Sequence, residues 1–169
     1  MQRSDDLLAR ALAVLAGERA RLAALGLLGE PGDLVLVGGS SVPGALTRGD
    51  VDLHLRVPPD GFAGAVEALR GPYVVVHPEI WQPTLATFAV PGAPLPTGVA
   101  VTPRGSEHDV RFTLTWRRIA ADPELLAQDN ALKAHDDAGY EARKSAFFDR
   151  VVAGGRTAAG PQSAVTSVT

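Results

Sequence analysis

Residues 51–57 constrain the fold of this chain more than any other segment. Valine and leucine alternate there with aspartate, histidine and arginine. This is the period of a β-strand, whose successive side chains point to opposite faces of a sheet. We therefore expect the aliphatic residues to face a hydrophobic core, namely Val51, Leu53, Leu55 and Val57. The other face then carries the polar residues, which are Asp50, Asp52, His54 and Arg56.

A glycine-serine turn precedes this strand. It reads Gly38-Gly39-Ser40-Ser41 and follows a short aliphatic strand expected at residues 33–37. Glycine permits close approach of the backbone to a ligand, and successive N–H groups form an anion-binding nest, so we expect the turn to hold phosphate. The segment lacks the ending of a P-loop, and Gly44 comes too late for a serine-hydrolase elbow. An ordinary turn at the end of a strand is the alternative interpretation.

Asp50 and Asp52 are the candidate metal ligands. Two neighbouring carboxylates repel each other, and a divalent cation such as Mg²⁺ or Mn²⁺ relieves that repulsion. Two alternatives stay open. In the first, both aspartates are solvent-facing residues of an edge strand. In the second, Asp50 belongs to a turn with Gly49, and the strand determines the position of Asp52 alone.

The turn and the two aspartates resemble the DNA polymerase beta-like nucleotidyltransferase superfamily, in which such a turn is followed by Asp-x-Asp on a strand. Further matches narrow the resemblance to the GrpB family of small nucleotidyltransferase-like proteins, over roughly residues 33–152. These matches are Gly-Gly-Ser-Ser-Val-Pro-Gly at residues 38–44, Asp52, Asp122-Pro123-Glu124-Leu125, Leu132-Lys133 and Tyr140-x-x-x-Lys144-x-x-Phe147.

The chain also departs from this family, so it resembles a divergent member. Leu36 and Gly39 stand where the family has histidine and serine, and residues 115–117 replace its Phe-Arg-Asp. Asp50 stands at a position that is usually aliphatic, which brings the chain closer to the Asp-x-Asp of the wider superfamily.

The resemblance implies roles for several residues. Superfamily carboxylates hold two magnesium ions, and a third carboxylate completes the site, so Asp50 and Asp52 are implied as metal ligands and catalytic residues. We take Asp109 as the third catalytic acid, with Glu107 and Glu79 as alternatives. Arg48 and Lys144 are the implied phosphate-binding cations. Lys133 is a further cation on the C-terminal helices, and a solvated helix face is the alternative for both lysines.

Composition excludes some classes of function. A formal charge of −3 and an isoelectric point near 5.8 argue against nonspecific nucleic-acid binding. The chain has no cysteine, which excludes thiolate metal sites and cysteine nucleophiles. Charged residues interrupt the apolar N-terminal stretch, unlike a signal peptide or a membrane span, so we expect a cytoplasmic protein.

The hydrophobic content, 46% of 169 residues, suits a single domain over residues 1–152, followed by a flexible tail at 153–169. We expect helices at residues 4–25, 62–69 and 122–135 and around 140–152, and strands at 33–37, 51–57, 73–77, 85–90 and 99–102. Residues 110–119 fit either a strand or a helix. The expected fold is α/β (α+β), with a mixed, twisted sheet of about five strands and the N-terminal and C-terminal helices packed on it.

The leading hypothesis is a Mg²⁺-dependent nucleotidyltransferase-like protein that transfers a nucleoside monophosphate from an NTP to an acceptor that the sequence does not identify. The alternative is a noncatalytic nucleotide-binding or partner-binding module with a degenerate active site.

Overall fold

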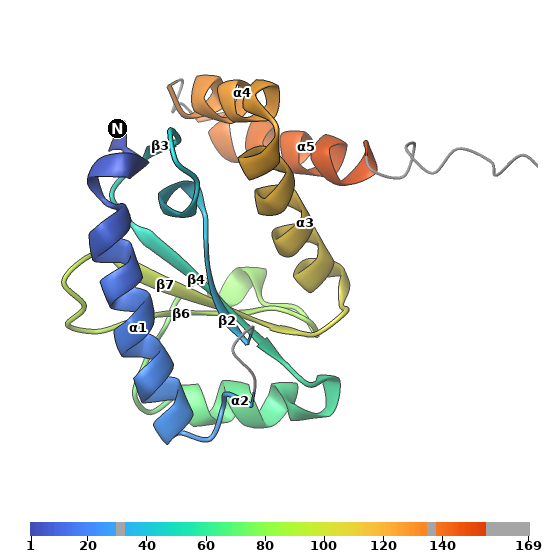
Figure 1. Ribbon diagram of the computed structural model, residues 1–169. Coiled ribbons are helices and arrows are strands. Elements are labelled where there is room, and N and C mark those ends of the chain that lie inside the picture. The colour runs from blue at the N-terminus through green and yellow to red at the C-terminus, as the bar shows by residue number, and fades with distance from the viewer. Residues whose placement is uncertain (30–32, 135–137, 155–169) are drawn as a thin grey trace, which may run out of the picture.

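A five-stranded sheet forms the centre of the structure, a computed structural model that describes residues 1–29, 33–134 and 138–154 (Figure 1). The strand order is β2-β4-β7-β6-β5. The bounds are Leu34–Val37 (β2), Val51–Val57 (β4), Thr97–Pro103 (β7), Ala86–Ala89 (β6) and Val74–Val75 (β5). β4 and β7 run parallel, and the other neighbouring pairs run antiparallel. The mixed α/β fold predicted from the sequence is confirmed.

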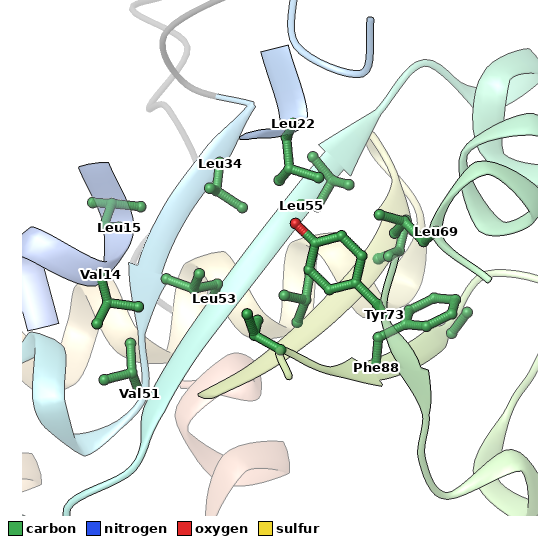
Figure 2. Close-up of a cluster of buried hydrophobic side chains, with 14 of the residues drawn as sticks. Val14, Leu15, Leu22, Leu34, Val51, Leu53, Leu55, Leu69, Tyr73 and Phe88 are labelled. Carbon is green, nitrogen blue, oxygen red and sulfur yellow. The ribbon is translucent and has the colours of Figure 1, made fainter. Parts of the chain in front are cut away.

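The hydrophobic core lies on one face of this sheet, under α1 (Leu8–Ala24) and α2 (Phe62–Leu69). A single turn of 3-10 helix, η3 (Pro59–Gly61), leads into α2. Figure 2 shows side chains of both helices meeting those of β2, β4 and β6. The four aliphatic residues of β4 are all buried in this core, as the alternation predicts, because each β-strand turns every second side chain to the same face.

The N-terminal segment is tied to the glycine-serine turn. β1 (Gln2–Arg3) pairs antiparallel with β3 (Leu46–Thr47), and η1 (Ser4–Asp6) precedes α1. The buried Ser4 hydroxyl donates to the Val42 carbonyl (2.6 Å). The helix ends at Ala24, one residue before the predicted end at residue 25.

Three helices follow β7: α3 (Glu107–Ala121), α4 (Pro123–Ala134) and α5 (Tyr140–Ala153). Figure 1 shows α4 and α5 near the end of α3. Residues 110–119, for which the sequence fitted either a strand or a helix, are helical. The Ser106 hydroxyl caps this helix by accepting from the Asp109 N–H (3.3 Å). The Asp122 carboxylate caps α4 by accepting from the Glu124 N–H (2.9 Å), which agrees with the helix start predicted at residue 122.

A second buried cluster joins these helices to the loop after the turn. It consists of Val42, Ala45, Ile119, Phe147, Phe148 and Val151. Two further 3-10 turns are η2 (Gly39–Ser41) and η4 (Pro78–Ile80). None of the helices in the described ranges has the length and apolar character needed to cross a lipid bilayer. The predicted tail lies outside the described residues from residue 155 onward.

Candidate functional site

The polar side chains of β4 lie on the sheet face that packs against α3. The ring of His54 meets that of Phe112 on this helix, with their centroids 5.4 Å apart. Asp52 lies at the start of the strand and is half-buried, and Asp50 directly precedes the strand. The strand register places Gly98 of β7 and Val37 of β2 on either side of Asp52. Only a small residue flanks the carboxylate on the β7 side.

The glycines of the turn permit two close approaches. Gly38 has φ +74°, and a Cβ there would overlap the Asp52 carboxylate. A Cβ on Gly39 would lie 2.7 Å from the Leu46 carbonyl oxygen and 2.8 Å from the Lys133 ammonium nitrogen. The turn therefore brings its backbone against one carboxylate and one cation, which a side chain at either position would push away.

The two serines of the turn are placed differently from the glycines. The Ser41 hydroxyl donates to the Gly38 carbonyl (2.7 Å) within the turn. The buried Ser40 hydroxyl has no hydrogen-bond partner within the described part of the chain. Neither serine lines the pocket described next.

One small pocket brings together most of the residues that the sequence singled out. Its predicted members are Gly39, Arg48, Asp50, Asp52 and Lys144, and the other lining residues are Met1, Thr47, Trp116, Lys133, Tyr140 and Glu141. We call this the phosphate pocket, after the ligand proposed for it below. Its volume is about 70 Å³, and its walls come from the β3–β4 segment and helices α3, α4 and α5. Residues distant in sequence thus meet at one end of the sheet.

Tyr140 holds two of the cations in place. Its ring centroid lies 5.4 Å from the Arg48 guanidinium and 5.6 Å from the Lys144 ammonium group. A cation over an aromatic face is attracted by the ring quadrupole. The sequence analysis assigned this tyrosine no role at the site. Its spacing of four residues from Lys144 on one helix was the signal that the two side chains share a face.

Lys133 is the third cation of the phosphate pocket. It is buried and its ammonium group lies 2.6 Å from the Asp129 carboxylate, one helical turn away, and 5.4 Å from the Trp116 ring. The sequence identified Lys133 only as a helix cation. Its place against Gly39 depends on the packing of α4 on β3, where the Leu46 N–H donates to the Asn130 side chain (2.6 Å).

The two carboxylates affect each other. Burial, and next the charge of Asp50, raise the pKa of Asp52 from 3.8 to about 6, against the opposing charges of Lys144 and Lys133. Asp50 accepts a hydrogen bond from the Thr47 hydroxyl (3.2 Å). A divalent cation between the carboxylates would favour their ionised forms. The arrangement therefore suits a hard cation with oxygen ligands next to a group of cations that suit phosphate.

The structure does not bring Asp109 to this pair. Its carboxylate is buried at the opposite end of β4, where it accepts from Arg56 Nε (2.5 Å), Arg56 Nη2 (2.9 Å) and the Gly105 N–H (2.8 Å). Burial opposes ionisation, but these hydrogen bonds hold the pKa of Asp109 below its usual range. Glu79 is exposed beside His77 (3.2 Å). In the described ranges, no cluster of three or more acidic or histidine side chains could hold a metal.

His54 and Arg56 belong to this second polar cluster. His54 is fully buried and its Nε2 lies 2.7 Å from the Thr102 hydroxyl. Burial lowers the pKa of His54 to about 4, despite the nearby charge of Asp109, so the ring is neutral at physiological pH. These two residues therefore have a structural role, because their side chains connect β4 to β7 and α3.

The fold is the one that the sequence resemblance implies. No family model and no curated protein matches the chain. Among solved structures, the chain is similar to the conserved protein GrpB from Enterococcus faecalis, with a TM-score of 0.59 and 15% sequence identity. The match covers 83% of this chain and 90% of that chain. At this identity the similarity shows the fold alone, and the chain has a GrpB-like fold.

Proposed function

We propose that the phosphate pocket binds the phosphates of a nucleoside triphosphate together with Mg²⁺ or Mn²⁺. The observation that carries this proposal is the meeting of two neighbouring carboxylates, Asp50 and Asp52, with the cations Arg48, Lys133 and Lys144 in one pocket. Burial, and next the charge of Asp50, raise the pKa of Asp52 despite the charges of Lys144 and Lys133, so ionisation of both carboxylates is unfavourable in the absence of metal. A metal-phosphate complex supplies both the missing positive charge and an anion for the surrounding cations.

The residues present fit a magnesium ion. Carboxylate oxygens are its preferred protein ligands, and it usually keeps several waters and binds through one or two carboxylates plus substrate phosphates. Asp50 and Asp52 would hold it. When bound, the ion would neutralise phosphate charge and lower the pKa of an attacking hydroxyl.

The three cations would contribute to phosphate binding in different ways. The planar guanidinium of Arg48 suits bidentate hydrogen bonding to phosphate oxygens, whereas Lys144 acts as a point charge. Lys133 is already paired with Asp129, so its contribution is a fixed positive charge next to the Gly39 backbone. The ring of Tyr140 limits the positions that Arg48 and Lys144 sample.

Nucleotidyl transfer is the second candidate function. It is favoured by the paired carboxylates, which would hold the metal ion that this reaction requires. Binding ranks first because the described residues include no group of three or more acidic or histidine side chains that could hold a metal, although the Glu141 carboxylate lines the same pocket. The acceptor would carry a free hydroxyl or phosphate.

Thermal denaturation with and without each of the four NTPs and Mg²⁺ tests the binding proposal. A ligand that binds only the native state, at a hundred times its Kd, stabilises it by about 2.7 kcal/mol. We expect this gain in the wild type and in Asp60→Asn, which changes an exposed aspartate outside the pocket. Asp52→Asn should lose it. Equal gains in the wild type and Asp52→Asn for every NTP would reject phosphate binding at this pocket.

Pyrophosphate release from labelled NTPs, with cell extract supplying acceptors, tests the second candidate. Asp50→Asn and Asp52→Asn should each remove the release almost completely, because each takes away a charge of the metal ligand pair while preserving side-chain volume. Release at the wild-type rate by both variants would exclude this site as its source.

A further inference from the structure

A second and larger cleft adjoins the phosphate pocket. Its volume is about 570 Å³, within the range of pockets that hold small molecules. The two cavities share four lining residues, which are Asp50, Asp52, Trp116 and Lys144. A ligand with its phosphates in the pocket can therefore place its remaining part in this cleft.

The floor of the cleft is an area of sheet with small side chains. The register pairs Ala89 of β6 with Gly98 of β7, and Thr87 with Ala100, and all four residues line the cleft and are half-exposed. These side chains are small, and they share the sheet face of Asp52. A Cβ added at Gly98 would meet no atom closer than 3.9 Å, so the floor is open.

Aromatic side chains form the opposite wall. Phe112 and Trp116 lie one turn apart on α3, and both are half-exposed. Phe148 of α5 lies behind Trp116, with ring centroids 5.4 Å apart at an interplanar angle of 89°. A floor of small residues opposite aromatic rings leaves room for a planar group, which gains from stacking on the rings and from burial of apolar surface.

The lining is apolar away from the phosphate pocket. Among the described lining residues, the charged side chains are the three shared ones, Asp50, Asp52 and Lys144, and His77 adds an exposed, titratable ring that contacts Glu79. The Thr87 hydroxyl already donates to the Val76 carbonyl (2.7 Å) and accepts from the Trp81 indole N–H (3.1 Å). The chemistry of this lining therefore selects an uncharged group.

We propose that this cleft binds an uncharged planar ring, carried either by the base of the bound nucleotide or by the acceptor molecule. The inference rests on the proposed function for the position of the phosphates. Recognition of the ring itself depends on the sheet floor and the aromatic wall and needs no metal.

The test uses substitutions that place larger side chains on the floor of the cleft. Ala100→Leu adds apolar volume to the cleft, and Ala89→Leu does so from the neighbouring strand. Ala9→Leu makes the same change at an exposed position of α1 that lines none of these cavities. Circular dichroism selects the folded variants. Calorimetric titration then measures binding of uncharged rings without metal, namely the four nucleosides and 2-naphthol, and of ATP and inorganic tripolyphosphate with Mg²⁺.

We expect at least one uncharged ring to bind the wild type and Ala9→Leu, and to bind a folded floor variant at least tenfold more weakly. If nucleosides and ATP weaken together, the base is the ring; if 2-naphthol alone weakens, the ring belongs to the acceptor. Absence of binding by every uncharged ring, or equal binding by the floor variants, would overturn the inference. Failure of the phosphate proposal is seen separately, as absent binding of tripolyphosphate to the wild type.

Discussion

Replacing Asp52 by asparagine removes a carboxylate whose ionised form the fold disfavours. In the absence of metal, burial and the charge of Asp50 raise its pKa from 3.8 to about 6. The folded protein therefore holds this proton more tightly than the unfolded chain does. It follows that Asp52 lowers the free energy of unfolding as the pH rises from about 4 to about 6, and that the loss is complete above this range.

The size of the effect follows from the two pKa values. A difference between 3.8 and about 6 corresponds to about 3 kcal/mol, at about 1.4 kcal/mol for each pKa unit. About 2 kcal/mol of this develops between about pH 4.5 and pH 8. Because Asp52 is half-buried and partly solvated, we take about 1 kcal/mol as the smallest effect that the reasoning allows.

Urea denaturation in the presence of EDTA measures this directly. Asp52→Asn should be more stable than the wild type at about pH 8, and its advantage should shrink by about 1–2 kcal/mol at about pH 4.5. Asp60→Asn, at an exposed position, should show no such change with pH. An advantage of Asp52→Asn that is absent at pH 8, or that grows as the pH falls, would refute the reasoning.

Three further substitutions test particular contacts. Gly38→Ala should cost about 1–3 kcal/mol more than Gly92→Ala, since both sites have a positive φ but only the first would place a Cβ on a carboxylate; equal costs in urea denaturation would contradict this. Arg56→Ala should lower the free energy of unfolding by about 3–5 kcal/mol, because it removes the ion-pair partner of the buried Asp109 carboxylate. Arg70→Ala, which breaks an exposed ion pair with Glu67, should lower it by less than about 1 kcal/mol. Lys144→Met should weaken NTP binding about tenfold in calorimetry without abolishing binding of Mn²⁺ alone, and unchanged NTP affinity would remove this lysine from the site.

Most of the secondary structure could be predicted from local patterns in the sequence. The alternation over Val51–Val57 has the bounds of β4, and Asp122-Pro123 marks the start of α4. Residues 110–119 were ambiguous because their apolar side chains fit both periods. Their helix is fixed by the Ser106 cap and by packing of Ile119 against the C-terminal helices, which depends on tertiary structure.

The site was partly predictable for a similar reason. Asp50, Asp52 and Arg48 are close in sequence to the turn, so one strand and one loop determine where they lie. Asp109 was not predictable, because its partner Arg56 is 53 residues away and the helix start turns its carboxylate toward the other end of β4. Trp116 lines both cavities of the site. Its position there depends on how α3 packs over the sheet, which the sequence alone does not determine.

Binding of Mn²⁺ followed by electron paramagnetic resonance tests the central proposal most directly, because free and protein-bound Mn²⁺ give distinguishable signals. We predict that the wild type binds Mn²⁺ and that addition of ATP tightens this binding, since the phosphates supply further oxygen ligands. Asp50→Asn and Asp52→Asn should each abolish binding of Mn²⁺ alone, whereas Asp60→Asn should retain it. Mn²⁺ binding that is unchanged in both pocket variants, or absent from the wild type with and without ATP, would contradict the proposal that this carboxylate pair holds a metal-nucleotide complex.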